Sequence, residues 1–509
     1  MVVFVVRRLI VSFFVLLVAT FLVYILVVLS GDPLGYLATD QSPNKAQKIA
    51  LVIERLHLYQ PIPQRYLNWL GGVAGCVVPG QGCNLGLTKD GQQVSDLLTA
   101  AMGATLRLVV TATVLSIVIG VVIGIVSALR QYSGFDYTIT FSAFLFFSLP
   151  LFWVAVLLKQ YVAIAFNDWL TDPVIGLTTL VVLSVLSALT WRAVLGGDRR
   201  RKWIITGVAF VATAAILYSL SVSRWFAQPA LGPVLLTLLS VGSALAVTQL
   251  SASVARRTIL YATVGTALVG VVSSFLLRPV LEDPSWLIII LLLVVGLLIG
   301  AGIGYAAGGL DRPQAARACA LTAAFTGFWI FVDNTLNAFP AYSDAVGGRV
   351  IATIGSNTPN FEGTFWMHFI DSATHLALPT LAIMLISFAT YSRYTRATML
   401  ETLNQDYVRT ARAKGLTERT VVMRHAFRNA LIPVTTLMTY DFGTIIGGAV
   451  ITETVFGWQG MGRLFVSGLQ SFEPNPVMAF FIVTAVSIVV FNLIADILYA
   501  YLDPRIRVS

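Results

Sequence analysis

The sequence predicts an all-α polytopic membrane protein with about 12 transmembrane helices, and three observations support that fold class. Hydrophobic residues make up 57% of the 509 residues, whereas charged residues make up only 11%. The apolar residues are gathered in runs of about 20, the length that crosses a bilayer as a helix. The positive charges are concentrated in loops between alternate runs, as expected for cytoplasmic loops. This composition excludes a soluble protein, and the distribution of the charges explains the net charge of +9 without nucleic acid.

The first apolar run extends from Leu9 to Leu29, and Arg7 and Arg8 precede it. These two charges predict that the N-terminus lies in the cytoplasm. The run is long enough to span a bilayer, and the sequence SGDP at 30–33 is not a small-x-small cleavage site. We therefore interpret the run as the first transmembrane helix and not as a signal peptide.

Residues 30–104 form a long polar loop, which we expect to be a small folded cap outside the membrane. Cys76 and Cys83 flank the sequence VVPGQG in this loop, and either one small disulfide or two free thiols is compatible with their spacing. Cys319 is expected to be a buried small apolar residue. Three cysteines are too few and too scattered for a disulfide framework or a metal cluster, and we predict no metal site.

Eight apolar runs follow the polar loop before residue 337. The second predicted span is about 106–129, where Gly120 and Gly124 are spaced for close helix packing. The third is about 137–166, and Pro150 is expected to kink it. Six further runs then follow, at 174–194, 203–222, 231–252, 258–277, 286–307 and 319–336.

The last three predicted spans are about 373–394, 431–455 and 476–499, and the tail Asp503–Ser509 is predicted to end in the cytoplasm. Because six is an even number, the six additional runs return the chain to the side that it left. With this topology 22 of the 33 Lys and Arg residues fall in regions predicted inside and ten in regions predicted outside. The charge distribution therefore agrees with the predicted topology.

The polar segment 401–433 lies between the predicted spans 373–394 and 431–455, and almost all its charge is positive. Gly415 interrupts a stretch of helix formers, and Pro433 stands where the next apolar run begins. This pattern predicts a helix, a glycine turn and a second helix in the cytoplasm, where they can face a soluble partner. The basic residues are Arg409, Arg412, Lys414, Arg419, Arg424 and Arg428.

The strings RTARAKG at 409–415 and RHAFRNALIP at 424–433 resemble the EAA coupling loop of ABC importer permeases. They are most similar to the B-type membrane subunits of oligopeptide and dipeptide importers. Arg409 stands where the general motif has an acidic residue, and the spacing from Gly415 to Pro433 is longer than in the general motif, but both features resemble the peptide subfamily. The resemblance extends over about 1–165 and 366–509.

The resemblance implies a six-helix importer-type permease core and, within it, an inserted module. Residues 1–165 would form the N-terminal half of the core with the outer loop 30–104, and 166–338 the inserted six-span module. Residues 339–509 would form the C-terminal half with the coupling loop 395–430. The resemblance says nothing about the role of the insert, for which we expect a structural or assembly role.

The resemblance also implies a function and partners. The chain would be a permease subunit of an ATP-driven importer of short peptides in a bacterial plasma (inner) membrane. Its partners would be a second homologous permease subunit, an extracytoplasmic substrate-binding protein and two cytoplasmic P-loop ATPase subunits, which use ATP and Mg. The sequence has no GxxxxGK[ST] phosphate-binding loop, so we expect a transport subunit that is not itself an enzyme and binds no cofactor.

Two sets of residues are the candidate sites. The residues that the resemblance places on an ATPase subunit are Asp406, Tyr407, Arg409, Thr410, Ala411, Arg412, Ala413, Lys414 and Gly415. Ionisable residues within spans are costly and mark a candidate translocation path. Asp441, near Gly447, either lines this path or pairs with another helix, and Glu453 is either a gate or a structural hydrogen-bond partner. Lys159 is expected to extend to the outer interface.

Other functions are also compatible with the sequence. A secondary, ion-coupled transporter is compatible with 12 spans, although the sequence lacks matching mid-membrane acids in its two halves. A membrane enzyme built on His368, Asp371 and His375 has no paired metal motif or nucleophile to support it, and ordinary boundary histidines are expected. Within the importer family, nickel chelates, glutathione or other small solutes are alternatives to peptides.

Overall fold

The computed structural model describes residues 2–78, 82–251 and 256–502. These residues form helices joined by turns, and this described part holds no β-strand, only an isolated bridge between Leu87 and Gln93. Eleven of the described helices are long and apolar enough to cross a membrane. The predicted all-α polytopic fold is therefore confirmed. The tail Asp503–Ser509 lies outside the described residues.

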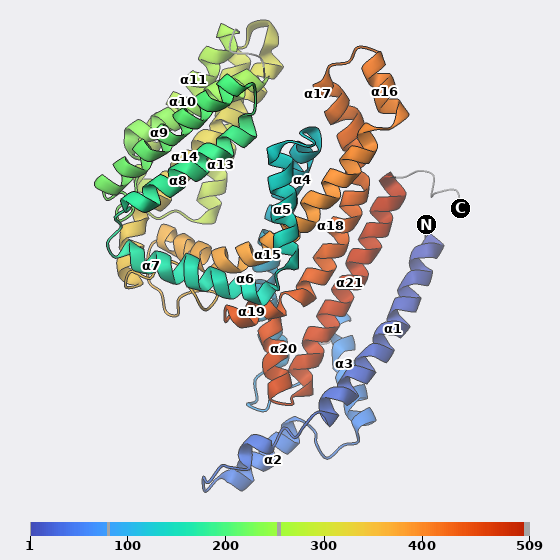
Figure 1. Cartoon of the computed structure of the whole chain (residues 1–509). Helices are drawn as coiled ribbons and strands as arrows, with labels where there is room; N and C mark the ends of the chain where they lie inside the picture. The colour runs from blue at the N-terminus through green and yellow to red at the C-terminus, as the bar shows by residue number, and fades with distance from the viewer. Residues whose placement is uncertain (1, 79–81, 252–255, 503–509) are drawn as a thin grey trace. The chain divides into compact units, whose positions relative to one another are not determined.

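The chain divides into two compact units, and most of their helices are labelled in Figure 1. The first unit comprises Met1–Val162, Thr353–Ser356 and Leu376–Ser509, and the second comprises Ala163–Ala352 and Asn357–His375. The predicted domains 1–165, 166–338 and 339–509 stay predictions.

Long apolar helices form the first unit. Helix α21 contacts α1, α18 and α20, and α4 contacts α18, α20 and α21. Helices with apolar residues on all sides are expected for segments that face both protein and lipid. The helices of this unit, besides the segment 406–427 described below, are α1 (Val2–Leu29), α2 (Lys45–Arg55), α3 (Ile62–Val77), α4 (Val94–Leu129), α5 (Gly134–Ser148), α6 (Leu151–Leu157), α18 (Arg428–Gly448), α19 (Val450–Val455), α20 (Met461–Gln470), α21 (Pro474–Leu502) and most of α15 (Phe365–Leu403).

Close packing of α4 on α15 confirms the interpretation of the two glycines in the second predicted span. A Cβ atom at Gly120 would lie 2.6 Å from the Cβ of Tyr391, and one at Gly124 would lie 2.8 Å from the carbonyl oxygen of Ser392. A larger residue at either position would therefore push the two helices apart.

Two predicted spans differ from their expected form. Pro150 does not merely kink the third span, because α5 ends at Ser148 and α6 begins at Leu151, with Pro150 in an extended conformation between them. A proline lacks the amide hydrogen and disfavours helix in the residue before it, which explains the break. The predicted span 431–455 is divided into α18 and α19, and neither of these two helices is among the eleven described helices that are long and apolar enough to cross a membrane.

The predicted outer cap is built on α2 and α3, and α3 was not predicted. Tyr66 and Trp69 of α3 are buried against Tyr24 and Met478. The hydroxyl groups of Tyr66 and Thr20 are 2.8 Å apart, which fastens the cap to α1. Cys76 and Cys83 form a disulfide, so the first of the two alternatives for these cysteines is correct.

The second unit holds a helix at each of the six predicted apolar runs between 174 and 336. Helix α14 packs against α10, α11 and α13, whereas α8 and α9 form a hairpin. Small residues allow this close approach, as at Gly304, where a Cβ atom would overlap the Ala315 carbonyl oxygen. The helices are α7 (Ala165–Leu170), α8 (Leu177–Leu195), α9 (Arg199–Val222), α10 (Gly232–Ser251), α11 (Arg257–Leu276), α12 (Arg278–Leu281), α13 (Trp286–Ala307), α14 (Arg312–Ala345) and the first turns of α15.

Candidate functional site

The polar segment between α15 and α18 has the predicted shape of a helix, a glycine turn and a second helix. Helix α16 extends over Asp406–Ala413, α17 over Glu418–Thr420, and a π-helical segment over Val421–Phe427 leads into α18. Gly415 has a φ of +76°. That backbone conformation favours glycine, so this residue makes the turn possible. In Figure 1, α16 and α17 lie at the end of the first unit opposite to α2 and α20.

Helix α16 is fixed to its neighbours through one apolar face. Val408 is fully buried and Ala411 nearly so. They belong to a cluster with Met399 of α15, Ala128 at the end of α4 and Ala426 before α18. Because one compact cluster joins α16 to three long helices, a displacement of α16 would be transmitted to those helices.

The opposite face of α16 presents charge to solvent. Nη1 of Arg409 lies 3.8 Å from Oδ1 of Asp406, and the side chains of Arg409 and Asp406 are 69% and 99% exposed. Arg412 donates to Glu418 over 2.8 Å across the glycine turn, and this hydrogen bond lowers the pKa of Glu418. The turn is therefore closed by an ion pair, while Arg409 and Tyr407 remain exposed. The candidate coupling residues thus lie on one loop, and all of them except Ala411 are exposed.

A buried ion pair near this loop was not predicted. Asp136, at the start of α5, accepts hydrogen bonds from Nε and Nη2 of Arg396 in α15, at 2.7 and 2.8 Å. It also accepts from the Ser127 hydroxyl and the Tyr132 amide. The Arg396 guanidinium lowers the pKa of Asp136 to about 2. The local signal in the sequence was Ser133, whose hydroxyl caps α5 by accepting a hydrogen bond from the Asp136 amide. Such a cap indicates where a helix begins, but it does not indicate that Arg396 pairs with Asp136.

Two of the candidate path residues lie on α18. Asp441 is half-buried in α18, and the Tyr391 hydroxyl of α15 interacts with its carboxyl group. Gly447 lies in the packing of α18 on α21, since a Cβ there would lie 2.9 Å from Cγ2 of Thr484. Their role in a path stays a prediction.

Glu453 in α19 is fully buried and hydrogen-bonded. Its carboxylate accepts from the Thr105 hydroxyl at 2.6 Å and from the amides of Gly462 and Arg463 at 2.7 and 3.3 Å. A Cβ atom at Gly460 would overlap this carboxylate, so the turn before α20 is built around it. This geometry favours the structural alternative for Glu453 over the gate.

Lys159 also has a protein partner. Its ammonium group donates to the carbonyl oxygen of Val455 at 3.1 Å and lies 5.9 Å from the centre of the Phe456 ring. The Lys159 side chain therefore joins the segment after α6 to the end of α19. The sequence predicted that it extends to the outer interface but did not predict this contact.

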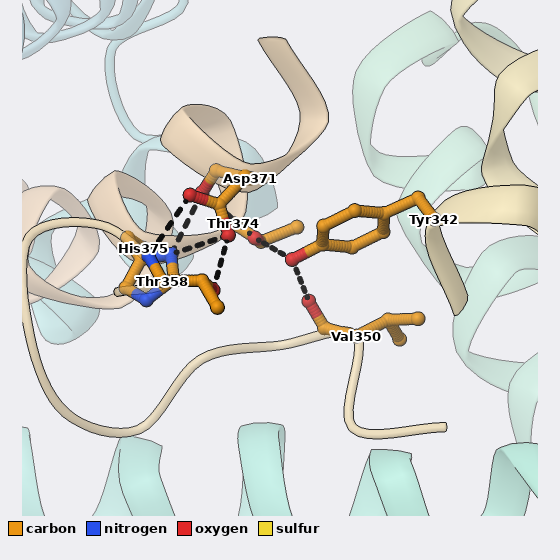
Figure 2. Close-up of polar contacts among 6 residues, drawn as sticks. All are labelled: Tyr342, Val350, Thr358, Asp371, Thr374 and His375. Carbon is orange, nitrogen blue, oxygen red and sulfur yellow. Dashed lines mark hydrogen bonds and ion pairs between the residues drawn. The ribbon is translucent and has the colours of Figure 1, made fainter. Parts of the chain in front are cut away.

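Two of the three residues considered for an enzyme site, Asp371 and His375, take part in a structural network (Figure 2). Asp371 accepts from the amide and the hydroxyl of Thr358 at 3.1 and 2.6 Å, and Nδ1 of His375 donates to the Asp371 carbonyl oxygen at 2.8 Å. The Tyr342 hydroxyl donates to the Val350 carbonyl oxygen. These bonds hold the loop after α14 against α15. Within the described ranges no cluster of three metal-ligating side chains occurs.

Comparison with known proteins gives two findings. Residues 284–508 match the family described as binding-protein-dependent transport system inner membrane component. The match begins at α13, inside the segment predicted to be an insert, so the comparison does not confirm that an insert is present.

Curated relatives match over shorter stretches. The oligopeptide transport system permease protein OppB of Mycobacterium tuberculosis is 42% identical over 165 residues, which are 32% of this chain and 51% of the relative. AppB of Bacillus subtilis, of the same description, is 45% identical over 155 residues, 30% of this chain and 48% of the relative. The dipeptide transport system permease protein DppB of Escherichia coli is 44% identical over 140 residues, which are 28% of this chain and 41% of the relative. The chain thus spans about half the length of the curated relatives that it matches, or less.

Proposed function

Because residues 284–508 carry a domain of the binding-protein-dependent transport system inner membrane component family, we propose that this chain is a permease subunit of an ATP-driven peptide importer. The names of the relatives, which are oligopeptide and dipeptide permease proteins, support peptides over nickel chelates or glutathione as the substrate class. In this proposal the protein lies in the bacterial plasma membrane and forms half of the translocation path with a second permease subunit.

The observation that carries the proposal is the exposed loop at α16. Two cytoplasmic ATPase subunits bind ATP and Mg, and α16 docks on one of them through Asp406, Tyr407 and Arg409. Closure of the ATPases moves α16, and the cluster around Val408 transmits this movement to α15 and α18. The chain itself contributes no ATP site, so the free energy of transport comes from its partners.

Outside the membrane, a substrate-binding protein delivers the peptide to the end of the first unit that carries α2 and α20. The peptide then passes along a path to which α18 contributes Asp441 and Gly447. A carboxylate at Asp441 is suited to the amino terminus of a peptide, since a positive charge within the membrane requires a negative partner.

The coupling role is tested by changing the glycine turn. Proline at Gly415 requires a negative φ and removes the amide that donates to the Arg412 carbonyl oxygen at 2.9 Å. We expect Gly415→Pro to insert normally and to co-purify with the second permease, but to lose peptide uptake and peptide-stimulated ATP hydrolysis. Gly415→Asn is the matched control, because asparagine tolerates a positive φ.

Two results would contradict the proposal. Unchanged uptake in Gly415→Pro would remove the coupling role of the loop. Purification of the chain without any ATPase, with transport driven by an ion gradient, would instead establish a secondary transporter.

A further inference from the structure

The second unit contains a cavity of about 500 Å³ that the proposed transport cycle does not use. Its walls are α11, α13 and α14, with Trp366 of α15 at one end. Glycines on the walls leave this space: a Cβ atom at Gly296 would meet no other atom within 4 Å, and one at Gly327 only the tip of Leu293. The volume falls in the range of about 300–1,000 Å³ that is typical of ligand sites.

The cavity opens on the apolar outer surface of these helices. Val269, Leu293 and Phe328 line it and are at the same time 46%, 44% and 53% exposed. The most apolar part of α13 has a mean hydropathy of 3.0, and little of it is buried within the protein. In a bilayer such a surface faces hydrocarbon, so the cavity is continuous with the lipid and not with water.

The cavity extends along the direction of the helices. Its lining extends on α13 from Ile289 to Ile303 and on α14 from Ala323 to Asn334. At 1.5 Å per residue these stretches are about 21 Å and about 16 Å long. One leaflet of the hydrocarbon core is about 15 Å thick. An acyl chain that extends through one leaflet therefore fits the length of the cavity.

Aromatic side chains and a cation mark one end of the cavity as the level of the lipid headgroups. Trp366 donates from its indole nitrogen to the Leu281 carbonyl oxygen at 2.6 Å, which fixes the ring at the cavity wall. Arg278 lies in α12 between the lining residues Leu277 and Leu281, and it is exposed. Aromatic residues gather at membrane interfaces, and here edge-to-face contacts join Trp286, Phe331, Phe365, Trp366 and Phe369.

We propose that this cavity holds one acyl chain of an anionic membrane phospholipid, which enters sideways from the bilayer, and that the lipid phosphate pairs with Arg278. The apolar walls match the acyl chain, and the positive charge beside Leu277 and Leu281 matches the phosphate. The bound lipid would fill a space that the helices of the second unit leave between them. This inference does not depend on what the protein transports.

The test uses the full-length chain, purified with the subunits that accompany it and placed in lipid nanodiscs. The nanodiscs contain a phosphatidylglycerol with a photoactivatable diazirine on its acyl chain. After irradiation and digestion, mass spectrometry locates the labelled residues. We expect strong labelling of 289–303 and 323–334, and weaker labelling of α9, a helix with no buried side chain, which reports on ordinary lipid contact.

Two glycines on α13 provide a matched pair of variants. Gly296→Leu places a side chain in the cavity, whereas Gly302→Leu places one outside it, and neither Cβ meets an atom within 4 Å. We expect Gly296→Leu to reduce cavity labelling about tenfold, corresponding to about 1.4 kcal/mol, and Gly302→Leu to leave it unchanged. Arg278→Gln should reduce labelling by phosphatidylglycerol more than labelling by a zwitterionic lipid with the same diazirine chain.

The outcomes distinguish a lipid bound in the cavity from ordinary lipid contact and from a protein segment in the cavity. Labelling of α9 that is equal in all variants shows that each variant is folded in the bilayer. Labelling of the cavity no stronger than that of α9 would overturn the proposal, since it would show ordinary lipid contact only. The proposal would equally fail if the walls were unlabelled, because a protein segment would then occupy the cavity, or if Gly296→Leu had no effect.

Discussion

Replacing Asp136 by asparagine removes a buried charge at the junction of α4, α5 and α15. The Asp136 side chain is 3% exposed, whereas that of Arg396 is 28% exposed. The pKa of Asp136 is lowered from 3.8 to about 2, chiefly by the hydrogen bond from Arg396. At about 1.4 kcal/mol per pKa unit, the ionised form of Asp136 stabilises the folded state by about 2 kcal/mol.

We therefore expect Asp136→Asn to lower the free energy of unfolding by about 2 kcal/mol at neutral pH. The assay is equilibrium unfolding in mixed detergent micelles, followed by circular dichroism. Asp172→Asn, at an exposed aspartate, is the control and should change stability little. Because a single replacement leaves Arg396 without its carboxylate, adding Arg396→Gln should cost less than the sum of the two single changes.

The same ion pair predicts a dependence on pH. The pKa of Asp136 is lower in the folded state, so its contribution is complete above a pH of about 4 and is lost as the pH falls from there towards 2. Asp136→Asn should abolish that part of the acid sensitivity. The reasoning would be refuted by a variant as stable as Asp172→Asn, or by strictly additive effects of the two replacements.

Three further predictions concern the candidate sites. Arg409→Glu should abolish peptide-stimulated ATP hydrolysis without loss of folded protein. Arg419→Glu, a charge reversal at another exposed arginine of the same loop, should retain this hydrolysis, and equal activities of the two variants would contradict a special role of α16. Glu453→Gln should lower stability by about 1–3 kcal/mol in thermal unfolding, because the amide nitrogen of glutamine cannot accept the backbone hydrogen bonds, and an unchanged unfolding temperature would contradict this. Thiol titration of the denatured, unreduced chain should find one reactive thiol, that of Cys319, and a count of three would show that the disulfide does not form.

The sequence by itself determined the fold class and the positions of most of the long apolar helices. Each apolar run must satisfy its backbone hydrogen bonds internally in a bilayer, so that run length alone predicts a helix. Helices α8 to α11, for example, lie where the apolar runs predicted them, and α13 extends over the predicted 286–307. The turn at Gly415 was also predictable, since glycine there interrupts a local helical pattern.

Only the tertiary structure decided which polar groups meet. Asp136 and Arg396 are 260 residues apart in sequence, and Thr105 and Glu453 are 348 apart. No local pattern relates such positions, because their pairing depends on how α4, α5, α15 and α19 pack. The apolar cavity of the second unit could not be predicted from the sequence either. Gly300 packs against another helix and Gly296 borders an empty space, but the sequence does not distinguish these two glycines. The physical reason is that backbone hydrogen bonding is local along the chain, whereas packing and charge pairing join residues that the chain keeps far apart.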